Sequence, residues 1–241
     1  MDECLHYQGY DLPRPRRFEE SGRDPHDGLR AWSAITHGAG AVLAIVGTVL
    51  LCVRSAAWDL GGWASVYSIY GATMILLYTA SCLYHCLNVP VKGRLALRKL
   101  DHCSIYLLIA GTYTPVCLIP LRQAEGWGWS LFGVIWGLAV LGIVMTIFWV
   151  NAPRWVTSGV YIFMGWLAIL AIYPLWQTMG AAGVGWLLGG GVLYTVGGVC
   201  YAMKWPGRDN PKFGCHEIFH LFILAGSACH FFMIYNVFTR L

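Results

Sequence analysis

Long apolar runs separated by short polar stretches dominate this sequence. Seven of the runs reach roughly twenty residues, which is enough for a helix to cross the hydrocarbon core of a bilayer. They lie at about 31–53, 62–87, 101–119, 128–150, 155–177, 183–203 and 213–238. The stretches between them carry turn and charge signals, such as NAPR, QTMGAAG and KWPGRDNPK. We expect helices rather than a β-barrel, because the runs do not alternate as barrel strands do and a helix satisfies its own backbone in lipid.

The composition supports an all-α integral membrane protein. Hydrophobic residues make up 57% of the 241 residues, charged residues only 12%, and the mean hydropathy is +0.57. Soluble domains carry about 25% charged residues. The charged, Pro-rich residues 1–30 have no signal-peptide core, so we expect a retained, partly disordered tail before a seven-transmembrane domain at 31–241. The nine cysteines lie mostly inside apolar runs and indicate no disulfide framework.

The basic residues predict an orientation. The tail and the loops after the second, fourth and sixth runs hold thirteen of the sixteen Lys and Arg residues. The positive-inside rule therefore places the N-terminus in the cytoplasm and, with seven spans, the C-terminus outside. This arrangement explains the formal net charge of +4 without nucleic acid as a partner, and it disfavours a G-protein-coupled receptor. The compact loops favour a bacterial plasma membrane.

The ionisable residues of the spans fall at one depth, in the cytoplasmic half. They are His37 in the first span, Ser81 and His85 in the second, Asp101 and His102 in the third, and His216, Glu217 and His220 in the seventh. Residues four apart share a helix face, so Ser81 and His85 face the same way. Intramembrane ionisable residues normally face the bundle interior and mark function.

Three imidazoles and a carboxylate in a dry core favour a metal site. Three protein ligands and a water form the usual catalytic zinc arrangement, and His85, His216 and His220 are the candidate ligands. Zinc lowers the pKa of its bound water to about 7. Asp101 would then take or orient the proton of that water. Ser81, one turn from His85, would donate a hydrogen bond to a developing oxyanion.

Each candidate also has a purely structural explanation. The three histidines would then be hydrogen-bonded core residues. Asp101 would stabilise a helix start or pair with a neighbouring cation, and Ser81 would bond back to its own helix. His37 and His102 either orient site residues or lie at the membrane interface. The cysteines near the site are not expected to bind zinc; they are Cys82, Cys86, Cys103 and Cys215.

The run HEIFH at 216–220 formally matches the zincin motif H-E-x-x-H, in which Glu217 would be the general base. The membrane setting and the polar residues of the second and third spans favour a different arrangement. Glu217 is then expected to face the cytoplasmic interface or a basic loop. His230 lies roughly 15 Å farther along the helix than His220 and should make a separate polar contact.

The chain resembles the hemolysin III branch of the progestin and adipoQ receptor (PAQR) family. The resemblance covers nearly everything from residue 31 onward and rests on SAITHGAGA, SCLYH, RKLDHCSIYLLIAGTYTP and HEIFHLFILAGSACHFF. The wider CREST superfamily, which includes alkaline ceramidases, is marked by S-x3-H, an Asp and H-x3-H. Here these are Ser81-x3-His85, Asp101 and His216-x3-His220. Such relatives often carry Asn where this chain has Ser33.

The resemblance implies a seven-helix fold with a cytoplasmic N-terminus, Zn²⁺ held by His85, His216 and His220, and a water near Asp101. By analogy with adiponectin receptors and ceramidases, it implies a zinc-dependent intramembrane hydrolase. Its metal-activated water would attack the carbonyl of a lipid amide or ester such as ceramide. The family name implies an alternative, a non-enzymatic receptor-like or hemolytic, pore-forming protein with a structural zinc. Membrane lipids are the expected partners, and a homo-oligomer is left open.

Overall fold

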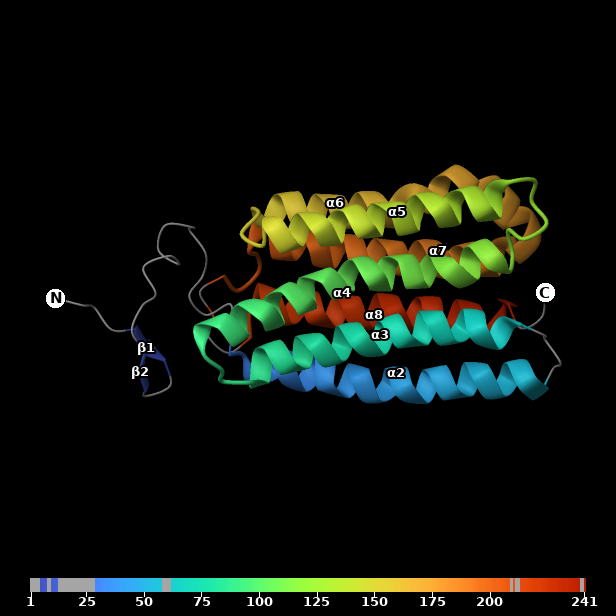
Figure 1. Ribbon diagram of the computed structural model, residues 1–241. Coiled ribbons are helices and arrows are strands. Elements are labelled where there is room, and N and C mark those ends of the chain that lie inside the picture. The colour runs from blue at the N-terminus through green and yellow to red at the C-terminus, as the bar shows by residue number, and fades with distance from the viewer. Residues whose placement is uncertain are drawn as a thin grey trace.

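The computed structural model describes residues 5–7, 10–12, 29–57, 62–208, 210, 213–238 and 241. Within them, long α-helices lie roughly side by side in an elongated bundle (Figure 1). Two short strands, β1 (Leu5–Tyr7) and β2 (Tyr10–Leu12), pair antiparallel before the first of these helices in the chain. Most of the tail that we expect to be partly disordered lies outside the described residues, so that expectation stays a prediction.

The described helices account for the apolar runs of the sequence. In chain order they are α2 (Ala31–Ala57), α3 (Trp63–Cys86), α4 (Val91–Leu118), α5 (Trp127–Phe148), α6 (Arg154–Trp166), the 3-10 turn η1 (Leu167–Ala171), α7 (Ile172–Met203) and α8 (Cys215–Asn236). Five helical segments of the described chain are long and apolar enough to cross a membrane: Ala31–Ala57, Trp63–Cys86, Trp127–Phe148, Arg154–Met203 and Cys215–Asn236. The protein is therefore a multi-pass membrane protein whose membrane part is helical.

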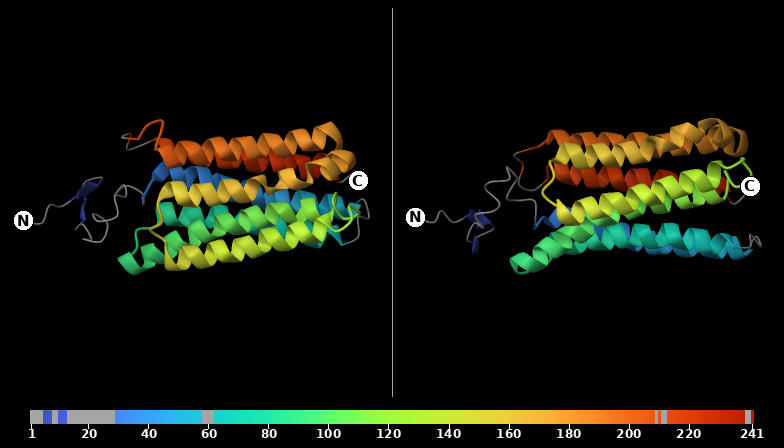
Figure 2. Two further views of the ribbon diagram at one scale, coloured as in Figure 1. Left: turned by 90° about the horizontal axis from the view of Figure 1, so that it is seen from above. Right: turned by 45° about the horizontal axis from the view of Figure 1, so that its top comes forward.

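Helix α7 is interrupted at Gly180. Its backbone angles there are φ 63° and ψ −172°, a combination essentially restricted to glycine. Figure 2 shows the chain turning back within α7, and the later part of α7 packs alongside α6. The reversal falls inside the stretch QTMGAAG, where the sequence predicts a break between the runs 155–177 and 183–203.

Helix α4 begins at Val91, whereas the sequence predicted a loop up to about residue 101. The basic stretch VKGRLALRK forms the first turns of the helix. Pro90 precedes it with φ −55°, which suits a helix start, and Leu, Ala, Arg and Lys are strong helix formers. The polar residues of α4 keep it out of the five apolar segments. It nevertheless packs between α3 and α5 along the bundle (Figure 1).

One end of the bundle gathers four helix ends. The first turns of α2, α4 and α8 and the last turn of α3 all lie there (Figure 1). The candidate site residues lie in or near these turns, so the helices bring them to one end of the bundle; they are His37, Ser81, His85, Asp101, His216 and His220.

Glycines allow the helices to pack closely, as is usual for membrane bundles. A Cβ atom added to Gly142 of α5 would collide with the ring of Tyr106, which is fully buried on α4. A Cβ atom added to Gly111 of α4 would collide with Thr73 of α3. Close contacts between α3, α4 and α5 therefore depend on the absence of side chains at these two positions.

Gly142→Ala is expected to lower the thermal unfolding temperature of the detergent-solubilised protein. Overpacking against a buried ring typically costs about 1–3 kcal/mol, which exceeds the ~1 kcal/mol that Ala gains over Gly in a helix. Gly137→Ala on the same helix is the matched control, because no atom lies within 4 Å of its added Cβ. It should be neutral or slightly stabilising. Equal unfolding temperatures for the two variants would contradict this view of the packing.

Candidate metal centre

Three histidines from two helices converge at this end of the bundle. His85 from the last turn of α3 has its Nε2 3.1 Å from Nε2 of His216 on α8. One ring nitrogen from each of His85, His216 and His220 lies within 4.8 Å of the others, and all three residues are buried. Ligand nitrogens about 3.3 Å apart are what Zn–N bonds of ~2.05 Å give in a tetrahedron. The donor set of three buried imidazoles fits a zinc ion. The four neighbouring cysteines do not belong to this group.

The first turns of α8 present two of these histidines together. His216 and His220 are four residues apart on the same face of α8, and their ring centroids are 4.8 Å apart. The third histidine, His85, comes from α3 and is held by the segment before α2. The carbonyl oxygen of His85 accepts a hydrogen bond from the backbone N–H of Arg30, 3.1 Å away, which ties the start of α2 to the end of α3.

Glu217 is buried beside the histidines, with no exposed surface. Arg30 donates from Nε to Oε1 and from Nη2 to Oε2, at 2.6 and 2.7 Å. Ser33 Oγ donates to Oε1 over 2.9 Å, and the backbone N–H of Gly214 donates to Oε2 over 2.8 Å. Each carboxylate oxygen therefore accepts two hydrogen bonds. The carboxylate also caps the N-terminus of α8, where the helix dipole favours a negative charge.

This arrangement corrects one expectation and answers one open question. Glu217 does not face the cytoplasmic interface but is buried against Arg30. The zincin alternative loses its general base, since the carboxylate of Glu217 is fully engaged by other donors. Ser33, whose role the sequence left open, donates a hydrogen bond to that carboxylate. Sequence reasoning missed Arg30 because it treated residues 1–30 as a tail.

His37 lies directly against one of the candidate metal ligands. Its ring is stacked on that of His220, with centroids 3.5 Å apart and planes at 6°. His37 is buried, and neither of its ring nitrogens has a hydrogen-bond partner among the described residues. Thr36 Oγ1 lies 3.4 Å from Nδ1 of His220. His37 thus fixes the ring plane of His220, which favours the orienting role over a place at the membrane interface.

A cavity opens beside the histidine cluster. Its volume is about 140 Å³, and its walls come mainly from α4, α6, α7 and α8. Ser81 and Asp101 line it together with His216 and His220, so the structure brings both predicted catalytic residues to the same space as the candidate ligands. Most of the lining is apolar. Along α4 it runs from Asp101 to Val116, a rise of about 22 Å at 1.5 Å per residue.

Asp101 lies in the third turn of α4, ten residues after the helix begins at Val91, so it does not stabilise a helix start. Its Oδ2 lies 3.7 Å from Nδ1 of His102, and Nδ1 of His102 lies 2.9 Å from the carbonyl oxygen of Arg98. The guanidinium of Arg98 donates to Oδ1 of Asn151 at 3.3 Å. His102 is thus positioned beside the carboxylate, and it also lines the cavity.

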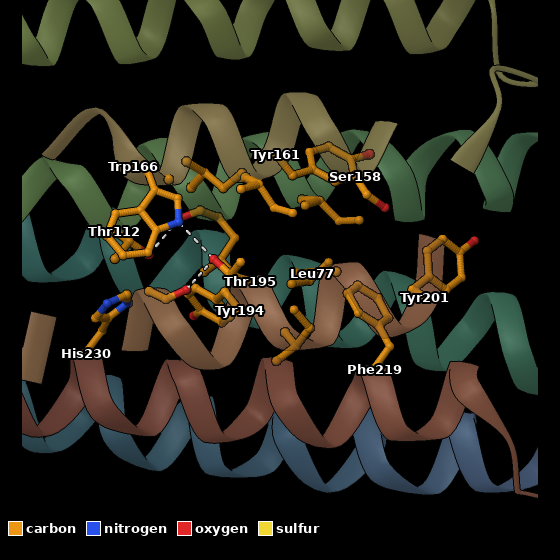
Figure 3. A pocket seen from close by; sticks show the side chains of 18 of the residues that line it. Leu77, Thr112, Ser158, Tyr161, Trp166, Tyr194, Thr195, Tyr201, Phe219 and His230 are labelled. Carbon is orange, nitrogen blue, oxygen red and sulfur yellow. Dashed lines mark hydrogen bonds between the residues drawn. The ribbon is translucent and has the colours of Figure 1, made fainter. Parts of the chain in front are cut away.

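His230 makes the separate polar contact that the sequence predicted. Its Nε2 lies 3.3 Å from the carbonyl oxygen of Leu187 on α7. It lines the part of the cavity that is far from the histidine cluster, together with Thr112, Trp166 and Thr195 (Figure 3).

Comparison with known proteins finds relatives over most of the chain. A family described as "Haemolysin-III related" matches residues 30–231. "Hemolysin-3" of Bacillus cereus is 42% identical over 202 residues, covering 84% of this chain and 88% of the relative. "Hemolysin-3 homolog" of Bacillus subtilis (strain 168) is 40% identical over 206 residues, covering 84% and 91%. "Adiponectin receptor protein" of Drosophila melanogaster is 31% identical over 153 residues, covering 58% of this chain and 34% of the relative.

Glu217→Gln is expected to destabilise the protein by about 3–5 kcal/mol, because it leaves the buried Arg30 charge without its counter-ion. The double variant Arg30→Met/Glu217→Leu removes both charges and should lose less. Thermal unfolding of the metal-free protein in detergent measures both effects. A double variant that is less stable than Glu217→Gln would contradict the assignment of this pair.

His37→Ala is expected to weaken zinc binding by about 10- to 100-fold, the usual effect of removing a group that orients a ligand. His37→Phe keeps an aromatic face against His220 and should retain most of the affinity. Competition with a chelator of known affinity gives the dissociation constants, and the visible spectrum of the cobalt-substituted protein reports the ligand geometry. Equal losses in the two variants would show that stacking does not matter.

Proposed function

The chain belongs to the haemolysin-III related family, and from this membership and the three converging histidines we propose that it is a zinc-dependent intramembrane hydrolase of a lipid amide or ester. The single observation that carries the proposal is that His216 and His220 line an apolar cavity together with Asp101 and Ser81. A structural metal clamp needs no such cavity. A hydrolase of a lipid needs one, because the chain next to the scissile bond has to be housed.

The residues of this site would divide the work as follows. His85, His216 and His220 would hold the zinc ion, which when bound supplies a Lewis acid and a water of lowered pKa. Asp101 would accept a proton at its carboxylate, whose Oδ2 lies 3.7 Å from Nδ1 of His102. Ser81 would donate a hydrogen bond to the oxygen on which negative charge develops.

The cavity would supply the remaining part of catalysis. Its apolar lining would exclude bulk water and hold the hydrocarbon chain of the substrate along α4, α7 and α8. Binding of the chain in this way would orient the carbonyl group toward the histidine end of the cavity. Holding the reacting groups together in this geometry would lower the barrier of the reaction. A ceramide-like lipid fits this division, with its polar headgroup at the membrane surface and its acyl chain in the cavity.

We further propose seven membrane crossings, with the N-terminus in the cytoplasm and the C-terminus outside, in the plasma membrane. The break at Gly180 supports separate crossings before and after it, and the position of α4 between α3 and α5 supports another. The distribution of Lys and Arg supports the orientation.

The names of the Bacillus relatives favour a second candidate, a cytolytic membrane protein. In that case zinc would only join α3 to α8, and the loss of His85 would lower stability without removing any catalytic activity. Release of a trapped dye from lipid vesicles measures this activity directly.

Asp101→Asn is expected to retain zinc and lose about 10²–10⁴-fold in turnover, because it removes a proton acceptor but no metal ligand. His85→Ala should lose both zinc and turnover. Metal content of the purified protein and release of fatty acid from ceramide are the two measurements. Glu125→Gln, the same carboxylate-to-amide change at an exposed position, is the control and should leave both unchanged.

The hydrolase proposal fails if the wild-type protein cleaves ceramide and other lipid amides or esters equally well before and after zinc is removed. It also fails if Asp101→Asn retains full turnover. Dye release that disappears with zinc, in the absence of any lipid hydrolysis, would support the cytolytic candidate in its place.

A further inference from the structure

The cavity has a second polar end, far from the histidine cluster. Figure 3 shows Tyr201 and Phe219 toward one end of the cavity and His230, Thr112 and Trp166 toward the other. Between the ends the lining is mostly aliphatic, although Tyr161 also contributes to it. It includes Ile105, Leu108, Ile109, Leu188 and Ile223. A plain hydrocarbon chain would match the middle of this cavity but would leave the second polar end without a partner.

Most polar groups at this end are already paired within the protein. Trp166 Nε1 donates to Thr195 Oγ1 over 2.9 Å, and Thr195 donates to the carbonyl oxygen of Gly191 over 2.8 Å. Thr112 Oγ1 donates to the carbonyl oxygen of Leu108 over 2.8 Å. The N–H and O–H groups of these side chains therefore already donate hydrogen bonds within the protein. Toward a ligand, only the hydroxyl oxygens of the two threonines can still act, as hydrogen-bond acceptors.

His230 differs from its neighbours because one of its nitrogens is unused. The residue is 6% exposed, and Nδ1 has no hydrogen-bond partner among the described residues. Figure 3 shows its ring directed from α8 toward Thr112. Nε2 lies 3.3 Å from the carbonyl oxygen of Leu187, and a carbonyl only accepts, so Nε2 carries the proton. An unpaired imidazolium would be costly here, so the ring is neutral and Nδ1 is an acceptor.

We propose that this end of the cavity binds a hydroxyl group carried by the hydrocarbon chain of the ligand, with Nδ1 of His230 accepting a hydrogen bond from that hydroxyl. The inference rests on the proposed function in taking a lipid chain as the occupant. A hydroxyl group supplies the donor that Nδ1 lacks. The substrate class is thereby narrowed to lipids with a hydroxylated acyl chain.

The helix geometry fixes where on the chain the hydroxyl group must lie. His230 is ten residues beyond His220, which corresponds to roughly 15 Å along α8. An extended chain advances ~1.2 Å per bond, since a fully extended residue of three bonds spans up to ~3.6 Å. The hydroxyl group therefore belongs about twelve bonds from the group bound at the histidine cluster. A hydroxyl next to the carbonyl would lie at the wrong end.

The test compares octadecanoic acid with its analogue that carries a hydroxyl group on carbon twelve. Both are measured by competition against radiolabelled octadecanoic acid on the full-length protein in detergent. The wild-type protein is expected to bind the hydroxylated acid about three- to tenfold more tightly, the usual range for one added hydrogen bond. In His230→Phe the ratio of the two affinities should fall to about one, while octadecanoic acid itself still binds.

Binding of octadecanoic acid serves as the folding control, and His230→Leu replaces His230→Phe if the larger ring prevents folding. Equal affinities of the two acids for the wild-type protein would overturn the inference, since Nδ1 then meets only an ordered water. A preference that survives in both His230 variants would overturn it as well.

The inference and the proposed function fail in different ways. Binding needs no turnover, so the wild-type protein is expected to prefer the hydroxylated acid whether or not it hydrolyses lipids. A preserved preference in a protein that hydrolyses no lipid would overturn the proposed hydrolase and leave the hydroxyl site standing. Failure of the wild-type protein to bind either acid would overturn both.

Discussion

The pairing of Glu217 with Arg30 is the interaction on which the functional end of the bundle depends. A carboxylate with no exposed surface, one residue from His216, is compatible with folding only if its charge is compensated. Arg30 compensates it from the start of α2, and the same residue hydrogen-bonds through its backbone to His85 at the end of α3. One residue thus links the three helix ends that carry or surround the candidate ligands.

This linkage also defines the role of Glu217 beside the histidines. Because Arg30, Ser33 and the N-terminus of α8 occupy all of the carboxylate, Glu217 has no capacity left to orient a water or accept a proton. The site therefore shares the sequence motif of the zincins but not a carboxylate that could act as the general base. In the proposed function, proton transfer would fall to Asp101, which lies on a different helix and lines the cavity together with His216 and His220.

The cavity has two polar ends and an apolar middle. One end joins the histidine cluster, the walls are aliphatic, and the other end presents His230 and paired hydroxyl groups. In the proposals above, an elongated amphiphile would bind at both ends of the cavity, at the histidine cluster and at His230. Elsewhere in the bundle the helices pack closely, because a Cβ atom at Gly142 or Gly111 would collide with a side chain of the neighbouring helix.

The apolar runs by themselves determined the helices and which helix turns carry the polar residues. A run of about twenty apolar residues in lipid forms a helix, because no water is present to form hydrogen bonds with its backbone N–H and C=O groups. The spacing of four between His216 and His220 likewise required a shared face. The reversal at Gly180 was visible as a polar, glycine-rich interruption of the pattern.

Other features were decided only by the tertiary structure. The partner of Glu217, the stacking of His37 on His220 and the second polar end of the cavity involve residues far apart in sequence, whose contact depends on how the helices pack. The early start of α4 was missed for a related reason. Local charge argued for a loop, whereas Pro90 and the helix-forming residues after it allow the helix to begin at Val91. Periodicity fixes which way a side chain faces on its own helix, but not which side chain it meets.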